Sequence, residues 1–215
     1  MNLIEIIDKY KSDKGNSSEG HRYSYIYNDY LEPLKMDNLN FMEIGIGTGE
    51  SVYAWYDYFI NSQIYMVDID DRSDEYDNDR IKCLVGDQSD ITSLNKIKDT
   101  VGSLDVFIDD GGHGMHHQQI SIGVFLPIIK DNGLYFIEDL HTSNFDPGST
   151  LYNQSLMINE DRSNTTLRVL KNFKSTGIFK SEFVDDETNE LITSLIKDVI
   201  FYNNDKLCLI IKNIK

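Results

Sequence analysis

The sequence predicts an α/β fold: a doubly wound, mostly parallel sheet of seven strands that ends in an antiparallel C-terminal hairpin. Three observations predict this class. Five apolar runs of strand length alternate with stretches of helical spacing, as in a parallel sheet covered by helices on both faces. Two further apolar runs flank an Asn-Asn-Asp turn, which is typical of a β-hairpin. Glycines or acids follow the parallel runs, at the sheet edge where ligands bind such folds.

The predicted elements follow in a regular order. Residues 3–10 form a helix, residues 11–24 a polar loop, and a Tyr-rich helix over residues 25–34 ends near Pro33. The five parallel strands are expected in NFMEIGIG, QIYMVDID, IKCLVGD, LDVFIDD and GLYFIED, and the hairpin in VIFYNNDKLCLIIK. Further helices are expected in ESVYAWYDYF and over residues 91–98, 115–129 and 163–174.

The length of 215 residues suits a single domain, with N-terminal helices and a lid segment over residues 1–37 and a Rossmann-like core over residues 38–215. The net charge of −16 argues against nucleic acid or membrane as a partner, because phosphate binding needs a basic surface. Neither a signal peptide nor a membrane span is expected. Cys83 and Cys208 are expected to be buried, reduced thiols of a cytoplasmic protein.

The first motif that carries chemistry is MEIGIGTGES, over residues 42–51. Its glycines, Gly45, Gly47 and Gly49, allow the backbone to turn tightly beside a ligand and enter a helix. Glycines also mark ordinary strand–helix turns, and the spacing differs from that of a dinucleotide-binding loop. The motif alone therefore indicates a cofactor loop but does not identify the cofactor.

The ends of the next two strands strengthen this interpretation. Asp68 lies about 20 residues after the glycines, where an acid accepts hydrogen bonds from ribose hydroxyls, although it could instead cap a helix. Asp87 and Gln88 are expected to face an adenine edge. Glu43 and Glu50 flank the glycines, and their charge disfavours a pyrophosphate but suits a ligand with an ammonium and a sulfonium. This favours S-adenosylmethionine over NAD.

The motifs IDDGGH and IEDLHTS follow the fourth and fifth strands. Asp110, Glu138 and Asp139 are therefore expected to converge at the same sheet edge. Oxygen ligands at an open site favour a hard cation such as Mg²⁺. The alternative is that one or two of these acids cap the helices that follow.

Histidines accompany the predicted metal ligands. His113 lies three residues after Asp110, and imidazole is suited to act as a general base at neutral pH. His116 and His117 are expected to start the next helix, with substrate contact by His117 left open, and His141 is a second base candidate. The role of Asp109 is also left open.

Six segments, DKG…HRYSYIY, FMEIGIGTGES, YMVDID, GDQSD, FIDDGGH…HHQ and GLYFIEDLHTS, resemble the macrocin-type family of S-adenosylmethionine-dependent O-methyltransferases. These enzymes methylate sugar hydroxyls on macrolides and are related to a cephalosporin-pathway group. The resemblance implies a Rossmann-like class I methyltransferase fold and matches the site predicted from the residues. It places the metal on Asp110, Glu138 and Asp139, the catalytic base on His113, and the cofactor at Glu43, Gly45, Ser51, Asp68, Asp87 and Gln88. We also expect Gly47, Gly49 and Asp110 to contact the cofactor.

Two departures from the family pattern concern the substrate and the assembly. Gly112 stands where the family has a serine. The macrolide enzymes also carry an additional N-terminal domain that helps to form oligomers and active sites, and we expect it to be missing here. A homo-oligomer is therefore left open.

The resulting hypothesis is Mg²⁺-dependent methyl transfer to a hydroxyl of a sugar or a glycosylated small molecule. A segment around Lys14, His21, Arg22 and Tyr23 is expected to form a lid, and residues 144–164 the acceptor wall. Three alternatives stay open. They are a catechol-like phenol as acceptor, a hydroxylase or dehydrogenase with another nucleotide cofactor, and a metal-stabilised binding protein without catalysis.

Overall fold

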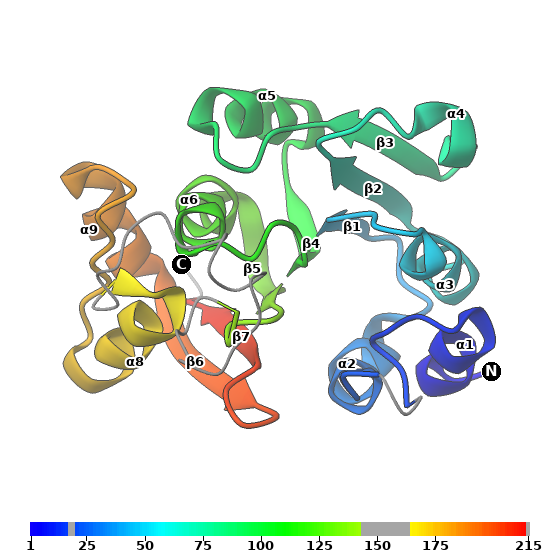
Figure 1. The fold of residues 1–215 in the computed structure, drawn as a ribbon, viewed down its shortest axis with the longest axis horizontal. Coiled ribbons are helices and arrows are strands. Elements are labelled where there is room, and N and C mark those ends of the chain that lie inside the picture. Colours follow the sequence, from blue (N-terminus) through cyan, green and yellow to red (C-terminus); the bar gives the residue numbers. More distant parts are fainter. Residues whose placement is uncertain (17–19, 143–163, 214–215) are drawn as a thin grey trace. The chain divides into compact units, whose positions relative to one another are not determined.

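The computed structural model describes residues 1–16, 20–142 and 164–213 (Figure 1). The chain divides into two compact units, Met1–Val85 and Gly86–Lys215. Both units combine strands with covering helices, so the α/β class is confirmed. The prediction that the chain forms a single domain stays a prediction.

The first unit contains a parallel sheet of β1 (Asn40–Ile44), β2 (Gln63–Asp68) and β3 (Ile81–Val85), in the order β3-β2-β1. Asn40 of β1 lies opposite Gln63 of β2, and Ile64 of β2 lies opposite Ile81 of β3. The elements of this unit are α1 Leu3–Tyr10, α2 Ser24–Leu31, a 3-10 helix Glu32–Leu34, β1 Asn40–Ile44, α3 Glu50–Tyr58, β2 Gln63–Asp68, α4 Ser73–Tyr76 and β3 Ile81–Val85.

Helix α1 begins with a capping box, in which the Asn2 side chain accepts from the backbone of Glu5 and the Glu5 side chain accepts in return from the Asn2 backbone. The apolar face of α1 is buried and packs against α3. In the core of the unit, the Trp55 ring lies 5.0 Å from Phe41 and 5.8 Å from Tyr27 between centroids. These aromatic contacts hold the helices against β1, whose end carries the glycine loop.

The second unit contains the strands β4 (Leu104–Asp109), β5 (Ile129–Ile137), β6 (Ile196–Tyr202) and β7 (Leu207–Lys212), in the order β4-β5-β7-β6. Strand β5 pairs in parallel with β4 and antiparallel with β7, which forms the C-terminal hairpin with β6. The elements are α5 Ile91–Val101, β4 Leu104–Asp109, α6 Met115–Phe125, a 3-10 helix Leu126–Ile128, β5 Ile129–Ile137, α8 Thr166–Thr176, α9 Asp186–Leu195, β6 Ile196–Tyr202 and β7 Leu207–Lys212.

The structure corrects several boundaries predicted from the sequence. Helix α6 ends at Phe125 rather than at Ile129, because Pro127 lies in the 3-10 helix that follows and Ile129 already belongs to β5. Helix α9 was not predicted, because its segment is mainly polar. Its N-cap is Asp185, which accepts a hydrogen bond from Thr188.

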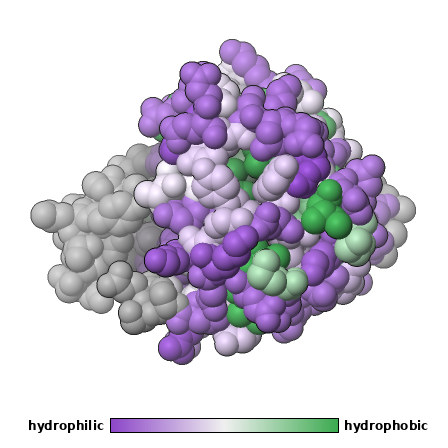
Figure 2. Space-filling model, turned by 90° about the vertical axis from the view of Figure 1, so that its right-hand side faces the viewer, coloured by the Kyte–Doolittle hydropathy of each residue, from purple (hydrophilic) through white to green (hydrophobic). Residues whose placement is uncertain are grey.

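Helix α4 was not predicted either, and the Tyr-rich helix ends at Leu31, before a 3-10 helix over Glu32–Leu34. The hairpin is confirmed, and its turn places Asn203, Asn204 and Asp205 at positive φ, which Asn and Asp tolerate better than most residues. Both cysteines are free thiols, but only Cys208 is fully buried, whereas Cys83 is partly exposed. Among the described residues, no helix is long and apolar enough to cross a membrane. The face drawn in Figure 2 is mostly hydrophilic, with hydrophobic residues in small separate groups.

A first prediction concerns the core of the second unit. The Phe107 ring is fully buried and lies 4.6 Å from the Tyr135 ring and 5.1 Å from the Phe125 ring between centroids. We expect Phe107→Ala to lower the free energy of unfolding by about 3–5 kcal/mol, because it removes apolar burial and leaves a cavity. The control Ile178→Ala, at an exposed side chain, should change it by less than about 0.5 kcal/mol. Urea unfolding followed by circular dichroism measures both, and equal losses would contradict this packing.

A second prediction concerns pH. Burial and the neighbouring His117 lower the pKa of His116 to about 4, against an ordinary value of 6.5, while Asp87 acts in the opposite direction. Between these two values the unfolded chain binds a proton at His116 that the folded chain does not bind. Folding stability should therefore fall as the pH drops through this window. In thermal melts between pH 7 and pH 4, His116→Gln should lose less stability than the wild type. Parallel curves for the two proteins would refute this contribution.

Candidate active site

The glycine loop after β1 has the backbone conformation that its sequence predicts. Gly45, Gly47 and Gly49 have φ values of 96°, 53° and 91°, in a region that strongly favours glycine. A Cβ atom at Gly49 would also lie 2.0 Å from the hydroxyl of Tyr76. The loop therefore exposes backbone at the carboxyl end of β1, where a cofactor can approach closely.

Asp68, at the end of β2, fastens this loop. Its Oδ2 accepts a hydrogen bond from the backbone of Ile46 at 2.9 Å, and its Oδ1 accepts from the backbone of Asp70 at 3.1 Å. The next helix, α4, has Arg72 at its N-cap. Asp68 is thus not the helix cap that the sequence left open, and it stays a candidate for binding ribose hydroxyls.

Glu43 is fully buried beneath the glycine loop. Its Oε2 accepts hydrogen bonds from Ser51 at 2.7 Å and from Trp55 Nε1 at 3.0 Å. The buried ammonium of Lys14 lies 3.3 Å from its Oε1. Glu43 therefore does not present an unpaired negative charge, and of the two acids expected to disfavour a pyrophosphate, only Glu50 stays near the solvent.

The segment expected to form a lid is tied to the first unit. Besides the ion pair between Lys14 and Glu43, the backbone carbonyl of Lys14 accepts from Ser24 at 2.9 Å. His21 stacks on Tyr23 with 5.3 Å between ring centroids, and its Nε2 lies 4.0 Å from Asp13. Movement of this segment as a lid stays a prediction. The acceptor wall expected over residues 144–164 falls, except for Asn164, outside the described residues.

In the second unit, Asp87 and Gln88 lie between β3 and α5. Asp87 accepts hydrogen bonds from the hydroxyl and the backbone of Ser89, which lower the pKa of its carboxyl group. The Gln88 side chain is buried and points toward β4 and α6, where it donates to Asp109 and to Ser121. Contact of these two residues with an adenine ring stays a prediction, and for Gln88 the side-chain amide already has protein partners.

The two acidic motifs meet at the carboxyl ends of β4 and β5. Asp109 is in register with Ile137, so Asp110 and Glu138 leave adjacent parallel strands at the same level. A carboxylate oxygen of Asp110 lies within 4.8 Å of a carboxylate oxygen of Glu138. A carboxylate oxygen of Asp110 also lies within 4.8 Å of a ring nitrogen of His113 and of a carboxylate oxygen of Asp139. The structure thus brings together the three acids that were predicted to bind a metal.

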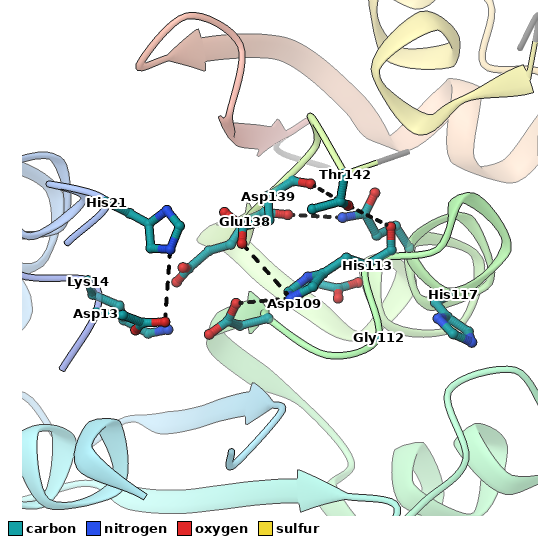
Figure 3. A network of polar contacts seen from close by, with 12 residues as sticks. Asp13, Lys14, His21, Asp109, Gly112, His113, His117, Glu138, Asp139 and Thr142 are labelled. Carbon is teal, nitrogen blue, oxygen red and sulfur yellow. Dashed lines mark hydrogen bonds and ion pairs between the residues drawn. The ribbon is translucent and has the colours of Figure 1, made fainter. Parts of the chain in front are cut away.

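His113 lies between Asp110 and Asp139, and Figure 3 shows it beside Asp139. Its Nε2 is 4.0 Å from an oxygen of Asp110 and 4.0 Å from an oxygen of Asp139. All three side chains are largely buried but keep 12–18% of their surface exposed. The cluster is therefore accessible to a small ligand while most bulk water is excluded.

The backbone on both sides of this cluster is in an unusual conformation. His113 and Asp139 have φ values of 55° and 53°, which is uncommon for residues other than glycine. The hydroxyl of Thr142 donates to the carbonyl of Asp139 at 2.8 Å and to that of His113 at 3.2 Å. Residues held in such conformations concentrate at functional sites, where the surrounding structure stabilises them. Thr142 was not predicted as a site residue, although it belongs to the quoted motif IEDLHTS.

Asp109 has a different role from Asp110. It is fully buried, and burial raises the pKa of its carboxyl group to about 6, although the hydrogen bond from Gln88 acts to lower this pKa. Its backbone carbonyl accepts from the backbone of Glu138 at 2.9 Å. Asp109 therefore braces the junction of the two loops.

The remaining histidines are placed largely as expected. His116 and His117 lie in the first turn of α6, and their rings are 3.8 Å apart between centroids. His117 is directed away from Asp139 and His113 (Figure 3). A Cβ atom at Gly112 would lie 2.4 Å from Nδ1 of His117, so this imidazole fills the space where a serine side chain would begin. His141 is partly buried beside Thr142, and its role as a base is untested.

The described residues fit a bound Mg²⁺ ion. Three carboxylates converge from adjacent loops, and oxygen ligands are those that Mg²⁺ prefers. The imidazole nitrogen of His113 is a poorer ligand for this hard cation, so His113 is better suited to proton transfer.

Comparison with known proteins confirms the resemblance seen in the sequence. The chain is 35% identical over 130 residues to 8-demethyl-8-α-L-rhamnosyl tetracenomycin-C 2'-O-methyltransferase of Streptomyces olivaceus, covering 57% of this chain and 34% of that protein. It is 32% identical over 148 residues to demethylmacrocin O-methyltransferase of Streptomyces fradiae, covering 66% and 37%. The matches span about a third of the length of these relatives. No protein-family model matches the chain.

Among solved structures, the chain is similar to the MycE methyltransferase of the mycinamycin pathway in complex with Mg, SAH and mycinamycin VI. The identity is 26% and the TM-score 0.78, over 99% of this chain and 55% of that one. A methyltransferase of Podospora anserina bound to SAH shares the fold at 15% identity, with a TM-score of 0.55. The predicted Rossmann-like methyltransferase fold is therefore confirmed, and the chain is similar in sequence and structure to sugar O-methyltransferases of macrolide and related pathways.

Proposed function

We propose that this chain transfers a methyl group from S-adenosylmethionine to a hydroxyl of a sugar or glycosylated small molecule, with Mg²⁺ as the metal. The observation that carries the proposal is the cluster in which His113 Nε2 lies 4.0 Å from both Asp110 and Asp139. A general base beside carboxylate ligands is the arrangement that activates a hydroxyl group for attack.

The similar proteins support the class of acceptor. The relatives from Streptomyces olivaceus and Streptomyces fradiae are named as O-methyltransferases of a rhamnosylated tetracenomycin and of demethylmacrocin. The similar solved structure contains Mg, SAH and mycinamycin VI. Because the matches cover only about a third of the curated relatives, the activity and the substrate of the whole protein are part of the proposal.

In the proposed reaction, the hydroxyl oxygen forms a bond to the methyl carbon as the bond from that carbon to sulfur breaks, giving a methyl ether and S-adenosylhomocysteine. His113 takes the hydroxyl proton at Nε2. Asp110 and Asp139 attract the imidazolium that results, since both lie 4.0 Å from this nitrogen. Asp110, Glu138 and Asp139 would hold Mg²⁺, and the bound ion would supply Lewis-acid stabilisation of negative charge on oxygen.

The cofactor would bind at the first unit's glycine loop and strand ends. Gly45, Gly47 and Gly49 allow close approach of a ligand to the backbone, and Asp68 lies at the position suited to ribose. The ion pair of Lys14 and Glu43 is buried beneath this loop and supports it. Ser51 contributes by holding Glu43.

His113→Gln tests the proposed base. We expect the rate of methyl transfer to a panel of deoxysugar glycosides to fall about 10²–10⁴-fold, because proton transfer loses its acceptor. Binding of S-adenosylhomocysteine and of Mn²⁺ should be retained, as measured by calorimetry. The matched control His116→Gln removes an imidazole from α6 and should stay close to the wild type. Loss of Mn²⁺ binding in His113→Gln would instead make His113 a ligand, and turnover of phenols alone would contradict the sugar acceptor.

Asp139→Asn tests the proposed metal site. The substitution removes one negative charge from the ligand set, so the Mn²⁺ dissociation constant should rise about tenfold or more. Electron paramagnetic resonance of free Mn²⁺ measures this change. Asp105→Asn, which alters an acid paired with Lys130 away from the cluster, serves as the matched control. EDTA should abolish methyl transfer in the wild type and added Mg²⁺ should restore it, whereas activity that persists in EDTA would refute the metal requirement.

A further inference from the structure

Gln88 has a hydrogen-bond arrangement that the proposed reaction does not use directly. The residue is 8% exposed, and its side chain reaches from the loop after β3 to the loop after β4. Its Nε2 donates to Asp109 Oδ1 at 2.7 Å and to Ser121 Oγ at 3.0 Å. Its Oε1 accepts from the backbone of Gly112 at 2.8 Å. One amide thus holds both the first and the fourth residue of the turn Asp109-Asp110-Gly111-Gly112.

These contacts enclose the residues that carry the proposed chemistry. Asp110 lies between Asp109 and Gly112, and His113 follows immediately. Asp109 is held in turn by β4, and Ser121 belongs to α6, so Gln88 connects the turn to two rigid elements. The other side of the turn contacts His117, which occupies the space beside Gly112.

We propose that Gln88 is a positioning residue, which fixes the spacing of Asp110 and His113 by holding the turn that carries them. The proposal rests on the proposed function, because it assigns Gln88 to the metal-binding and base-bearing loop. It differs from the sequence-based prediction that this side chain faces an adenine ring.

The chemistry of the amide explains why glutamine suits this position. The Asp109 carboxylate needs a donor, whereas the backbone N–H of Gly112 needs an acceptor, and a primary amide supplies both from one planar group. Glutamate would retain the acceptor but place a second carboxyl group against Asp109 without a donor. Methionine has a similar shape but leaves a buried carboxylate oxygen and a partly buried N–H without this partner.

The test uses the full-length protein with two variants of similar size, Gln88→Met and Gln88→Glu. We expect the Mn²⁺ dissociation constant of each to rise about 10–100-fold, as is typical when a residue that orients a metal ligand is lost. The affinity for S-adenosylhomocysteine should change by less than about threefold, since the cofactor loop lies in other elements. Electron paramagnetic resonance measures Mn²⁺ binding, and calorimetry measures the second ligand. The matched control Gln63→Met removes an amide that donates to Arg80 in the first unit and should leave Mn²⁺ binding unchanged.

The possible results separate this proposal from the proposed function. Folded Gln88 variants with Mn²⁺ affinity within about threefold of the wild type would overturn the positioning role. A loss of S-adenosylhomocysteine binding with unchanged Mn²⁺ affinity would also overturn it, in favour of direct cofactor contact. If the wild type binds neither probe, the proposed function itself fails. Melting temperatures show whether either Gln88 variant is unfolded. If one is unfolded, the other variant still tests the positioning role.

Discussion

The arrangement of the candidate site depends on holding like charges close together. Two carboxylates within 4.8 Å of each other repel by about 3–4 kcal/mol at an effective dielectric constant of 20. The left-handed backbone at His113 and Asp139 costs a further 1–3 kcal/mol or so at each residue. Pairing of β4 with β5 and the hydrogen bonds of Thr142 and Gln88 oppose both effects. A bound divalent cation would convert the repulsion into attraction, which is why such an arrangement is suited to metal binding.

Much of the fold could be predicted because its signals are local. Apolar runs, glycines and the Asn-Asn-Asp turn report the strands, the cofactor loop and the hairpin without knowledge of tertiary contacts. Helix α9 could not be predicted in this way, since its few apolar residues, such as Ile192 and Leu195, become meaningful only once they are buried. Helix α6 ends because Pro127 and the start of β5 follow it. The apolar residues continue from α6 into β5, so the sequence pattern does not show where the helix ends.

Charge, in contrast, could not be assigned from sequence alone. Glu43 and Glu50 both flank the glycines and were expected to act alike. The structure pairs Glu43 with Lys14, 29 positions earlier in the sequence, and buries both side chains. A buried ion pair contributes little net charge to its surroundings, and whether it stabilises the fold depends on how fully its desolvation is offset.

The roles of adjacent acids follow from strand geometry, which the sequence does not contain. Side chains alternate between the two faces of a strand, so the neighbours Asp109 and Asp110 enter different environments. Asp109 is fully buried and accepts a hydrogen bond from Gln88, which also donates to Ser121 of α6, whereas Asp110 stays partly exposed. The register of β4 with β5 then decides which residues meet: with Asp109 opposite Ile137, Asp110 stands beside Glu138. A shift of the register by one residue would exchange the buried and the exposed acids on one strand. The same two motifs would then bring a different pair of acids together, so the register, more than the motifs alone, determines that a metal site can form.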